Sequence, residues 1–250
     1  MIPEIGPIKT FGLMFGLAFI ASGLIVSRRL KEQGRSADWG YEIVFAALLG
    51  GVIGARLWWL LEDTGRLTDN LLGNVFGGAG LTWYGGALGG ALAVCIWARR
   101  RGILGLGLLD MCAPALAVGY AVGRIGCQLS GDGDYGKPWD GPWAMAYPDG
   151  VVPTDVPVHP TPIYETLAMG FAGLLLWRLR DRLAPGRLFA LYLVLAGVER
   201  LLVEFVRRNE AVALGLTVAQ WISIAMLVAG ATWLALTRAN ANAPTRSSLA

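Results

Sequence analysis

The chain has 250 residues, of which 55% are hydrophobic and 16% are charged, and its mean hydropathy is +0.53. Soluble domains carry roughly a quarter charged residues, so this composition excludes a disordered or fibrous protein and favours a polytopic membrane protein. The net charge of +3 is too small to indicate a nucleic-acid partner.

Seven apolar runs are candidates for membrane-spanning helices, each of which needs about 20 residues. They cover 11–27, 42–61, 81–98, 106–128, 163–177, 188–206 and 217–236. The stretch 129–162 differs, because it holds five aspartates and the only histidine and has no helical period. We predict a long loop region or re-entrant element there. The fold class is therefore all-α, with one domain of about seven transmembrane helices over 1–237 and a polar tail over 238–250.

The first run is expected to remain as a helix, because the N-terminus MIPEIGPIKT lacks the basic start of a signal peptide. Cys95, Cys112 and Cys127 lie in apolar stretches without CxxC spacing. Neither a disulfide framework nor a zinc site is therefore expected. We expect no metal and no cofactor.

Basic residues flank alternate spans. Thirteen of the 21 Lys and Arg residues follow the first, third, fifth and seventh runs, and five lie on the other side. The positive-inside rule then places the N-terminus outside and the C-terminus in the cytoplasm. The region 129–162 is accordingly predicted to be extracytoplasmic.

Three arginines, Arg56, Arg124 and Arg200, lie within or at the end of apolar spans. A charge in hydrocarbon costs at least ~2.5–3.5 kcal/mol on insertion scales, so such residues usually face a cavity and serve a function. Guanidinium groups match phosphate oxygens in geometry and charge, which indicates a pocket for a lipid phosphate headgroup. Arg200 and Glu204 share a helix face, and the alternative is that such pairs only hold helices together. The other acids in similar places are Asp110, Glu165 and Glu199.

Two glycine-rich segments add further polar groups. In segment 123–136, Arg124 is followed by four glycines and by the acids Asp132 and Asp134. The alternative interpretation of this segment is a solvated turn. Segment 82–86, Thr-Trp-Tyr-Gly-Gly, opens the third span. Its alternative is an interfacial aromatic belt followed by small packing residues.

Four motifs in chain order resemble the prolipoprotein diacylglyceryl transferase family of bacterial seven-helix membrane enzymes. They are Gly54-Ala55-Arg56, the signature from Gly123-Arg124-Ile125-Gly126 to Gly136, the run His159-Pro160-Thr161-Pro162-Ile163-Tyr164-Glu165, and the run Glu199-Arg200-Leu201-Leu202-Val203-Glu204-Phe205-Val206-Arg207. The similarity extends from Phe11 to the last span. The chain departs from the family pattern at Tyr84, where the family has histidine, and at Cys127, Gln128 and Ser130.

The resemblance implies transfer of the diacylglyceryl group of phosphatidylglycerol to the lipobox cysteine thiol of prolipoproteins, with release of glycerol phosphate. Its expected partners are phosphatidylglycerol, prolipoprotein signal peptides and the bilayer of the bacterial cytoplasmic (inner) membrane. One alternative is a paralogue that uses another acceptor, which the residues at Tyr84 and Cys127 motivate. A second alternative is a non-catalytic lipid-binding or transport protein.

The resemblance also suggests roles for individual residues. We expect Arg124 and Arg200 to hold the departing phosphate, with Arg56 in support and Glu204 orienting Arg200. The thiol must lose its proton, for which Tyr84, Asp134, Asp132 and His159 are candidates, although an unperturbed tyrosine with a pKa near ~10 is a poor base. The expected lipid-binding residues are Arg56, Arg124, Arg200, Gly85, Gly86, Gly136 and His159. Cys127 is expected to pack, because the acceptor brings its own thiol.

Overall fold

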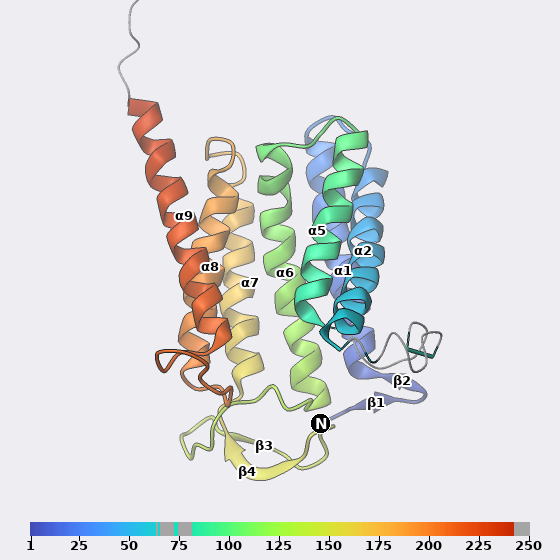
Figure 1. Cartoon of the computed structure of the whole chain (residues 1–250), viewed down its shortest axis with the longest axis vertical. Coiled ribbons are helices and arrows are strands. Elements are labelled where there is room, and N and C mark those ends of the chain that lie inside the picture. The colour runs from blue at the N-terminus through green and yellow to red at the C-terminus, as the bar shows by residue number, and fades with distance from the viewer. Residues whose placement is uncertain (64, 66–72, 75–81, 243–250) are drawn as a thin grey trace, which may run out of the picture. The chain divides into compact units, whose positions relative to one another are not determined.

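The computed structural model describes residues 1–63, 65, 73–74 and 82–242, and within them it has seven long helices and two short antiparallel hairpins (Figure 1). The helices are α1 (Thr10–Glu32), α2 (Asp38–Glu62), α5 (Trp83–Arg100), α6 (Leu106–Ser130), α7 (Thr161–Leu179), α8 (Arg187–Glu204) and α9 (Val218–Asn242). The hairpins pair β1 (Glu4–Ile5) with β2 (Ile8–Lys9), and β3 (Met145–Tyr147) with β4 (Thr154–Val158).

The predicted all-α class is confirmed, and the seven helices follow the order of the seven apolar runs. Four of the described helices are long and apolar enough to cross a membrane, namely α1, α2, α6 and the part of α9 over Val218–Thr237. The count of seven crossings stays a prediction. The predicted tail over 238–250 begins within α9, and from 243 onward it lies outside the described residues.

The chain divides into two compact units. The first contains Met1–Ser22 and the chain from Leu109 onward, and the second contains Gly23–Leu108. In the second unit, α2 and α5 pack through glycines spaced four apart. A Cβ atom on Gly54 would lie 2.3 Å from the carbonyl oxygen of Gly85, and one on Gly50 would lie 2.5 Å from that of Gly89. The glycines therefore let two backbones touch, as small residues do in membrane helix pairs.

In the first unit, α6, α7 and α8 share a core of small and aliphatic side chains. Its buried members are Ala113, Ala117, Ala121, Met169, Ala172, Leu176, Leu188 and Ala196. Alanines spaced four apart on α6 lie on one face of that helix. This close packing brings the charged residues of the three helices near one another.

The start of α8 is fixed by Asp110 of α6. Gly186 precedes α8 with a φ of 84° and supplies no side-chain cap. Instead, the Asp110 carboxylate accepts hydrogen bonds from the backbone N–H groups of Gly186 at 2.6 Å and Phe189 at 2.9 Å. A carboxylate at a helix N-terminus satisfies unpaired N–H groups and suits the helix dipole. The intramembrane position of Asp110 therefore has a structural reason.

The region 131–160 forms the β3–β4 hairpin and ordered loops at the end of the first unit where α6 ends and α7 begins (Figure 1). Backbone hydrogen bonds tie it to neighbouring segments, from Gly136 to His159 at 2.8 Å and from Lys137 to Val206 at 2.7 Å. The rings of Tyr135 and Tyr147 stack at 4.8 Å inside it. The loop is thus held against the end of α8.

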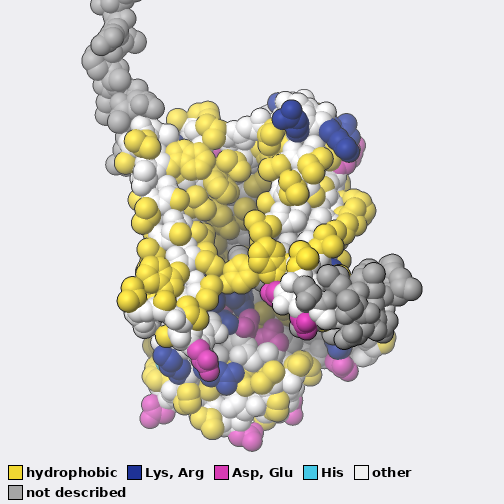
Figure 2. Space-filling view, in the orientation of Figure 1, with side chains coloured by type: hydrophobic (Ala, Val, Ile, Leu, Met, Phe, Trp, Pro, Cys, Tyr) yellow, Lys and Arg dark blue, Asp and Glu magenta, His cyan; other side chains and the backbone are white. Residues whose placement is uncertain are grey.

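Large hydrophobic side chains cover the exposed faces of α8 and α9 (Figure 2). Leu202, Val228 and Leu236 are all at least 60% exposed. Such faces suit contact with lipid tails rather than water. Charged side chains gather instead beside the 131–160 region.

Candidate active site

Four charged side chains from three helices of the first unit meet in one network. Glu165 of α7 is fully buried, and its carboxylate pairs with Arg124 of α6 at 3.0 Å and with Arg200 of α8 at 2.9 Å. Arg200 also pairs with Glu204, one turn further along α8, at 2.9 Å. The predicted shared face of Arg200 and Glu204 is confirmed. Glu165 is the centre of the network, since it joins both arginines that we expected to hold a phosphate.

The loop residue Asp134 extends the network outside the helices. Its carboxylate pairs with Arg124, and its Oδ1 accepts a hydrogen bond from Nη2 of Arg207 at 2.6 Å. Burial opposes ionisation of this carboxyl, but the two guanidinium groups outweigh burial and lower its pKa to about 2. Asp134 is therefore ionised at neutral pH and is a weak base.

Polar neighbours fix the two buried glutamates. The hydroxyl of Tyr120 donates to Oε1 of Glu165 at 2.9 Å. The Thr217 hydroxyl and the Asn209 amide donate to Oε1 of Glu204 at 2.8 and 2.7 Å. These hydrogen bonds give the buried carboxylate oxygens partners in place of water.

Both phosphate-binding candidates remain partly accessible. The Arg124 side chain is 14% exposed and the Arg200 side chain is 23% exposed, whereas Glu165 and Glu204 are fully buried. Arg207 is 9% exposed. Three guanidinium groups therefore meet three carboxylates, with two arginines turned partly outward, an arrangement that can bind a phosphate through charge-assisted hydrogen bonds.

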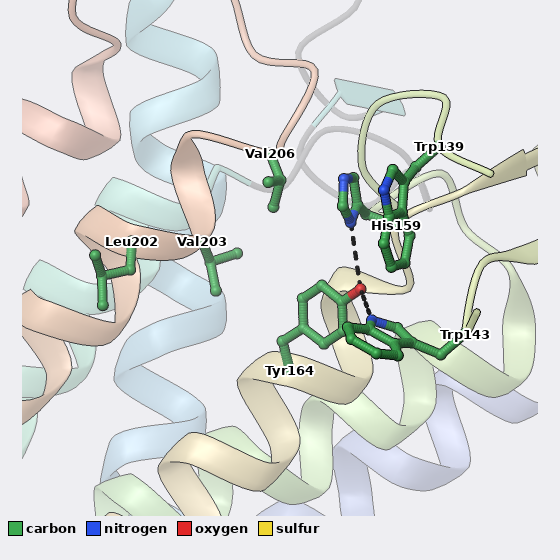
Figure 3. A pocket seen from close by; sticks show the side chains of 7 residues that line it. All are labelled: Trp139, Trp143, His159, Tyr164, Leu202, Val203 and Val206. Carbon is green, nitrogen blue, oxygen red and sulfur yellow. Dashed lines mark hydrogen bonds between the residues drawn. The ribbon is translucent and has the colours of Figure 1, made fainter. Parts of the chain in front are cut away.

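His159 lines a pocket together with Trp139, Trp143, Tyr164, Leu202, Val203 and Val206 (Figure 3). The pocket has a volume of about 410 Å³. The imidazole stacks on the Trp139 ring at 4.4 Å, and its Nδ1 lies 3.3 Å from the Tyr164 hydroxyl. Partial burial lowers the pKa of His159, which favours the neutral ring near pH 7.

Gly136 is closely packed beside this pocket. A Cβ atom there would lie 2.4 Å from the carbonyl oxygen of Val206 and 2.9 Å from the Cβ of His159. Because glycine has no side chain, the loop can approach the chain just after α8 at this position, and a larger residue would push the two backbones apart.

Tyr84, Gly85, Gly86 and Arg56 belong to the second unit. Tyr84 lies in the first turn of α5 and is 41% exposed. Gly85 lies against Gly54, and a Cβ atom on Gly86 would lie 3.5 Å from the carbonyl oxygen of Gly51. Arg56 is buried on α2, with its guanidinium carbon 5.0 Å from the centre of the Trp59 ring.

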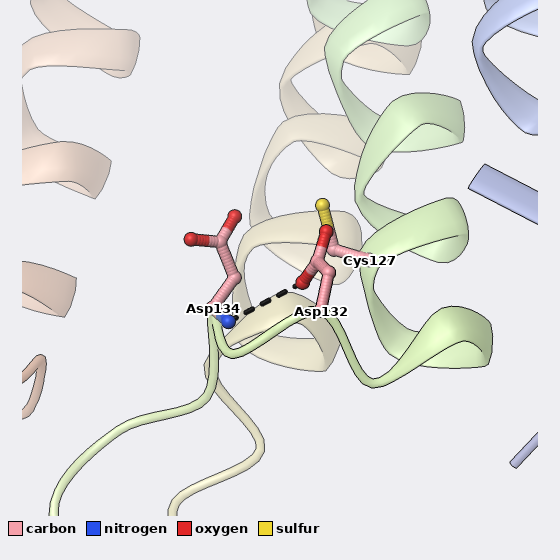
Figure 4. Close-up of side chains that lie close together, drawn as sticks. All are labelled: Cys127, Asp132 and Asp134. Atoms are coloured by element: carbon pink, nitrogen blue, oxygen red, sulfur yellow. Dashed lines mark hydrogen bonds between the residues drawn. The ribbon is translucent and has the colours of Figure 1, made fainter. Parts of the chain in front are cut away.

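Cys127, Asp132 and Asp134 place possible ligand atoms within 4.8 Å of one another (Figure 4). Asp132 accepts a hydrogen bond from the Asp134 backbone N–H at 3.3 Å. Both carboxylate oxygens of Asp134 already pair with arginines. Cys127 is buried and accepts a 3.6 Å hydrogen bond from Arg124, so these contacts explain the cluster without a metal ion.

Two members of the network were not assigned to the site from sequence. Glu165 and Arg207 each end a motif that resembles the family, but neither residue was given a role in the site. The signals available were the end of the His159–Glu165 motif and the three-residue spacing of Glu204 and Arg207. Tyr120 carried no sequence signal.

Comparisons of the sequence with known proteins identify the family. The family model of prolipoprotein diacylglyceryl transferase matches residues 1–236. The phosphatidylglycerol–prolipoprotein diacylglyceryl transferase of Clostridium tetani is 31% identical over 225 residues, covering 88% of this chain and 89% of that protein. Proteins of the same name from Polynucleobacter asymbioticus and Bordetella avium are 33% and 32% identical, over 89% and 94% of this chain and 89% and 92% of their own lengths. With its apolar helices, the chain is a multi-pass membrane protein and belongs to the prolipoprotein diacylglyceryl transferase family.

Proposed function

We propose that this chain is a transferase that moves the diacylglyceryl group of phosphatidylglycerol to the lipobox cysteine thiol of a prolipoprotein and releases glycerol phosphate. This is the first step of bacterial lipoprotein maturation. The names of the relatives support the donor lipid and the acceptor class. The observation that carries the proposal is the meeting of Arg124 and Arg200 on Glu165, since it holds two partly exposed guanidinium groups near one another.

In this proposal Arg124 and Arg200 bind the phosphate of the lipid. As the glycerol carbon–oxygen bond breaks, negative charge builds up on the leaving phosphate, and fixed guanidinium groups stabilise that charge. Glu165 and Glu204 keep Arg200 in place, so little reorganisation is needed during the reaction. In the first unit, Gly136 and His159 are further candidates for contact with the lipid, and in the second unit the candidates are Arg56, Gly85 and Gly86.

The acceptor thiol must be deprotonated, because the thiolate is the nucleophile. A pKa of about 2 makes Asp134 a weak base, which favours a role in holding Arg124 and Arg207. Tyr84, Asp132 and His159 remain candidates for contact with the thiol. The partial exposure of Tyr84 supports its access to a substrate.

We place the protein in the bacterial cytoplasmic membrane, with the N-terminus outside and the tail inside, because the basic residues follow alternate spans. The region 129–162 and the arginine network then face the outer side. Residues 1–237 form a single transferase domain in this proposal. Phosphatidylglycerol reaches the site from the bilayer, and the signal peptide brings its lipobox cysteine to the same face.

Mass spectrometry of a lipobox peptide incubated with the purified protein and phosphatidylglycerol tests the function. The expected product is the peptide with one added diacylglyceryl group, together with released glycerol phosphate. Arg124→Ala and Arg200→Ala should abolish formation of this product. Lysine at either position should restore little activity, because a single ammonium group cannot replace the two parallel N–H donors of a planar guanidinium group. Arg182→Ala is the matched control, since Arg182 is exposed outside the helices. Glycerol phosphate release without peptide modification would instead identify a different acceptor, and lipid binding without release would identify a non-catalytic protein.

A further inference from the structure

Glu199 is a buried acid of α8 that the proposed function leaves unused. The residue is 8% exposed, and its Oε1 atom is buried without a hydrogen-bond partner in the described part of the chain. The ion pairs of the neighbouring acids, formed by Glu165 and Glu204, do not include it. A carboxyl group in this position needs an explanation, because unpaired buried polar atoms are rare.

The helix register turns Glu199 toward α6 and α7. It lies on the same stripe of α8 as Ala196 and Val203, three and four residues away. Ala196 packs in the core with Ala121 of α6 and Met169 of α7. Glu199 is also close enough to interact electrostatically with the network, whose facing groups are Glu165 of α7, Arg124 and Tyr120 of α6, and Arg200, Arg207 and Tyr192 of α8. On its remaining neighbour, α9, the apolar stretch 218–237 has no charged residue.

The charges of the network settle which form of Glu199 fits. Three arginines pair with the three carboxylates of Asp134, Glu165 and Glu204. A fourth buried carboxylate would have no partner, which is unfavourable. A lipid phosphate would add another negative charge beside it. The neutral carboxylic acid is compatible with both conditions, and its O–H is then a hydrogen-bond donor without a partner among the described residues.

We propose that Glu199 is the proton relay of the transfer reaction, an inference that rests on the proposed function. The acceptor sulfur bonds to the glycerol carbon, the carbon–oxygen bond to phosphate breaks, and its electron pair stays on the phosphate oxygen. A separate base, for which Tyr84, Asp132 and His159 are the candidates, takes the thiol proton before the attack. Glu199 gives its own proton to the phosphate, which Arg200, the next residue of α8, helps to hold. The leaving group then departs with one negative charge, the same as in the lipid, and the base passes the thiol proton to Glu199, which restores both groups.

The test compares Glu199→Gln with wild type in the peptide assay. Glutamine keeps the size and the neutral charge of the acid but cannot release a proton. We expect kcat to fall at least tenfold, with the KM for phosphatidylglycerol within twofold and an unchanged midpoint of thermal unfolding. The kcat of wild type should also decline on the alkaline side as Glu199 loses its proton, and this decline should be absent from Glu199→Gln. Glu210→Gln, which alters an exposed acid after α8, is the control and should match wild type.

Full turnover by Glu199→Gln would overturn the relay, and so would a joint loss of lipid binding and turnover, because the side chain would then be a structural support. Should Glu199→Gln unfold, Glu199→Asp is the second variant. It retains an acid with a displaced carboxyl, so its alkaline limb should shift, and an unshifted limb would overturn the relay. Absence of transfer by wild type would overturn the proposed function itself, which differs from every result that concerns Glu199 alone.

Discussion

Replacing Glu165 should show how far the arginine network supports the fold. The side chain is fully buried and has three strong contacts, with Arg124 at 3.0 Å, Arg200 at 2.9 Å and the Tyr120 hydroxyl at 2.9 Å. Glutamine can keep the Tyr120 bond but loses the charge that the two arginines share. Removing one partner of a buried ion pair costs about 3–5 kcal/mol, because the remaining charge is left buried without compensation. We expect Glu165→Gln to lower the free energy of unfolding by this amount.

Reversible denaturant titration in mixed micelles measures that free energy, and Glu210→Gln serves as the matched control. An exposed substitution of this kind should change stability by no more than about 0.5 kcal/mol. The double variant Glu165→Gln/Arg200→Gln should be less unstable than the sum of the two single variants, because it removes both charges of one pair. A loss of less than about 1 kcal/mol in Glu165→Gln, or strict additivity in the double variant, would refute the view that Glu165 is the charged centre of the site.

Four further predictions concern separate features. Because the folded pKa of Asp134 lies below its ordinary 3.8, this group contributes stability above about pH 4 that is lost as the pH falls toward 2. Asp134→Asn should therefore lower the free energy of unfolding by about 1–2 kcal/mol at pH 7, a value reduced for partial exposure. In acid titrations the difference in stability between the two proteins should shrink from pH 4 downward and be lost near pH 2. Asp110→Ala removes the cap of α8 and should lower the free energy of unfolding by about 1–2 kcal/mol, seen in the same denaturant titration with lipid transfer retained. Tyr84→Phe should slow peptide modification tenfold or more if its hydroxyl bonds a charged substrate group, since such a bond is worth about 1.5–3 kcal/mol, whereas unchanged turnover would make it a belt residue. Reporter fusions after Arg101 and Arg182 should be cytoplasmic and one at Asp149 external, and a cytoplasmic Asp149 fusion would reverse the proposed orientation.

The sequence was sufficient for the helices because each depends on a local pattern. Apolar runs placed all seven, and the four-residue spacing of Arg200 and Glu204 predicted their pairing, which the structure confirms. Asp110 was recognised as an unusual charge, but its partners lie 76 and 79 residues away in the chain. Helix-capping contacts over such a distance depend on the packing of α6 against α8, which no local pattern encodes.

The end of α8 shows why the site itself was only partly predictable. The apolar run continues to 206, so Arg207 resembled a charge flanking a membrane span. In the structure α8 ends at Glu204, and the chain turns so that the Arg207 backbone N–H bonds the Glu204 carbonyl at 3.3 Å. That turn directs the Arg207 guanidinium onto Asp134 and Glu165. A difference of two residues in the helix end therefore changes the interpretation of Arg207 from a basic residue flanking a span to a buried member of the network.

In the proposed function the arginine network both stabilises the fold and binds a phosphate, and the burial of its acids indicates which ion pair the phosphate would replace. Glu165 and Glu204 are fully buried, whereas the Asp134 side chain is 34% exposed. Moving a carboxylate from its ion pair into water costs least free energy where the carboxylate is already partly hydrated, because no buried carboxylate is then left without a partner. A phosphate that approaches Arg124 should therefore replace Asp134 and leave Glu165 in place. In that proposal the loop that carries Asp134 would be coupled to lipid binding, because the Arg124–Asp134 ion pair that holds this loop to α6 is the one that the headgroup would displace.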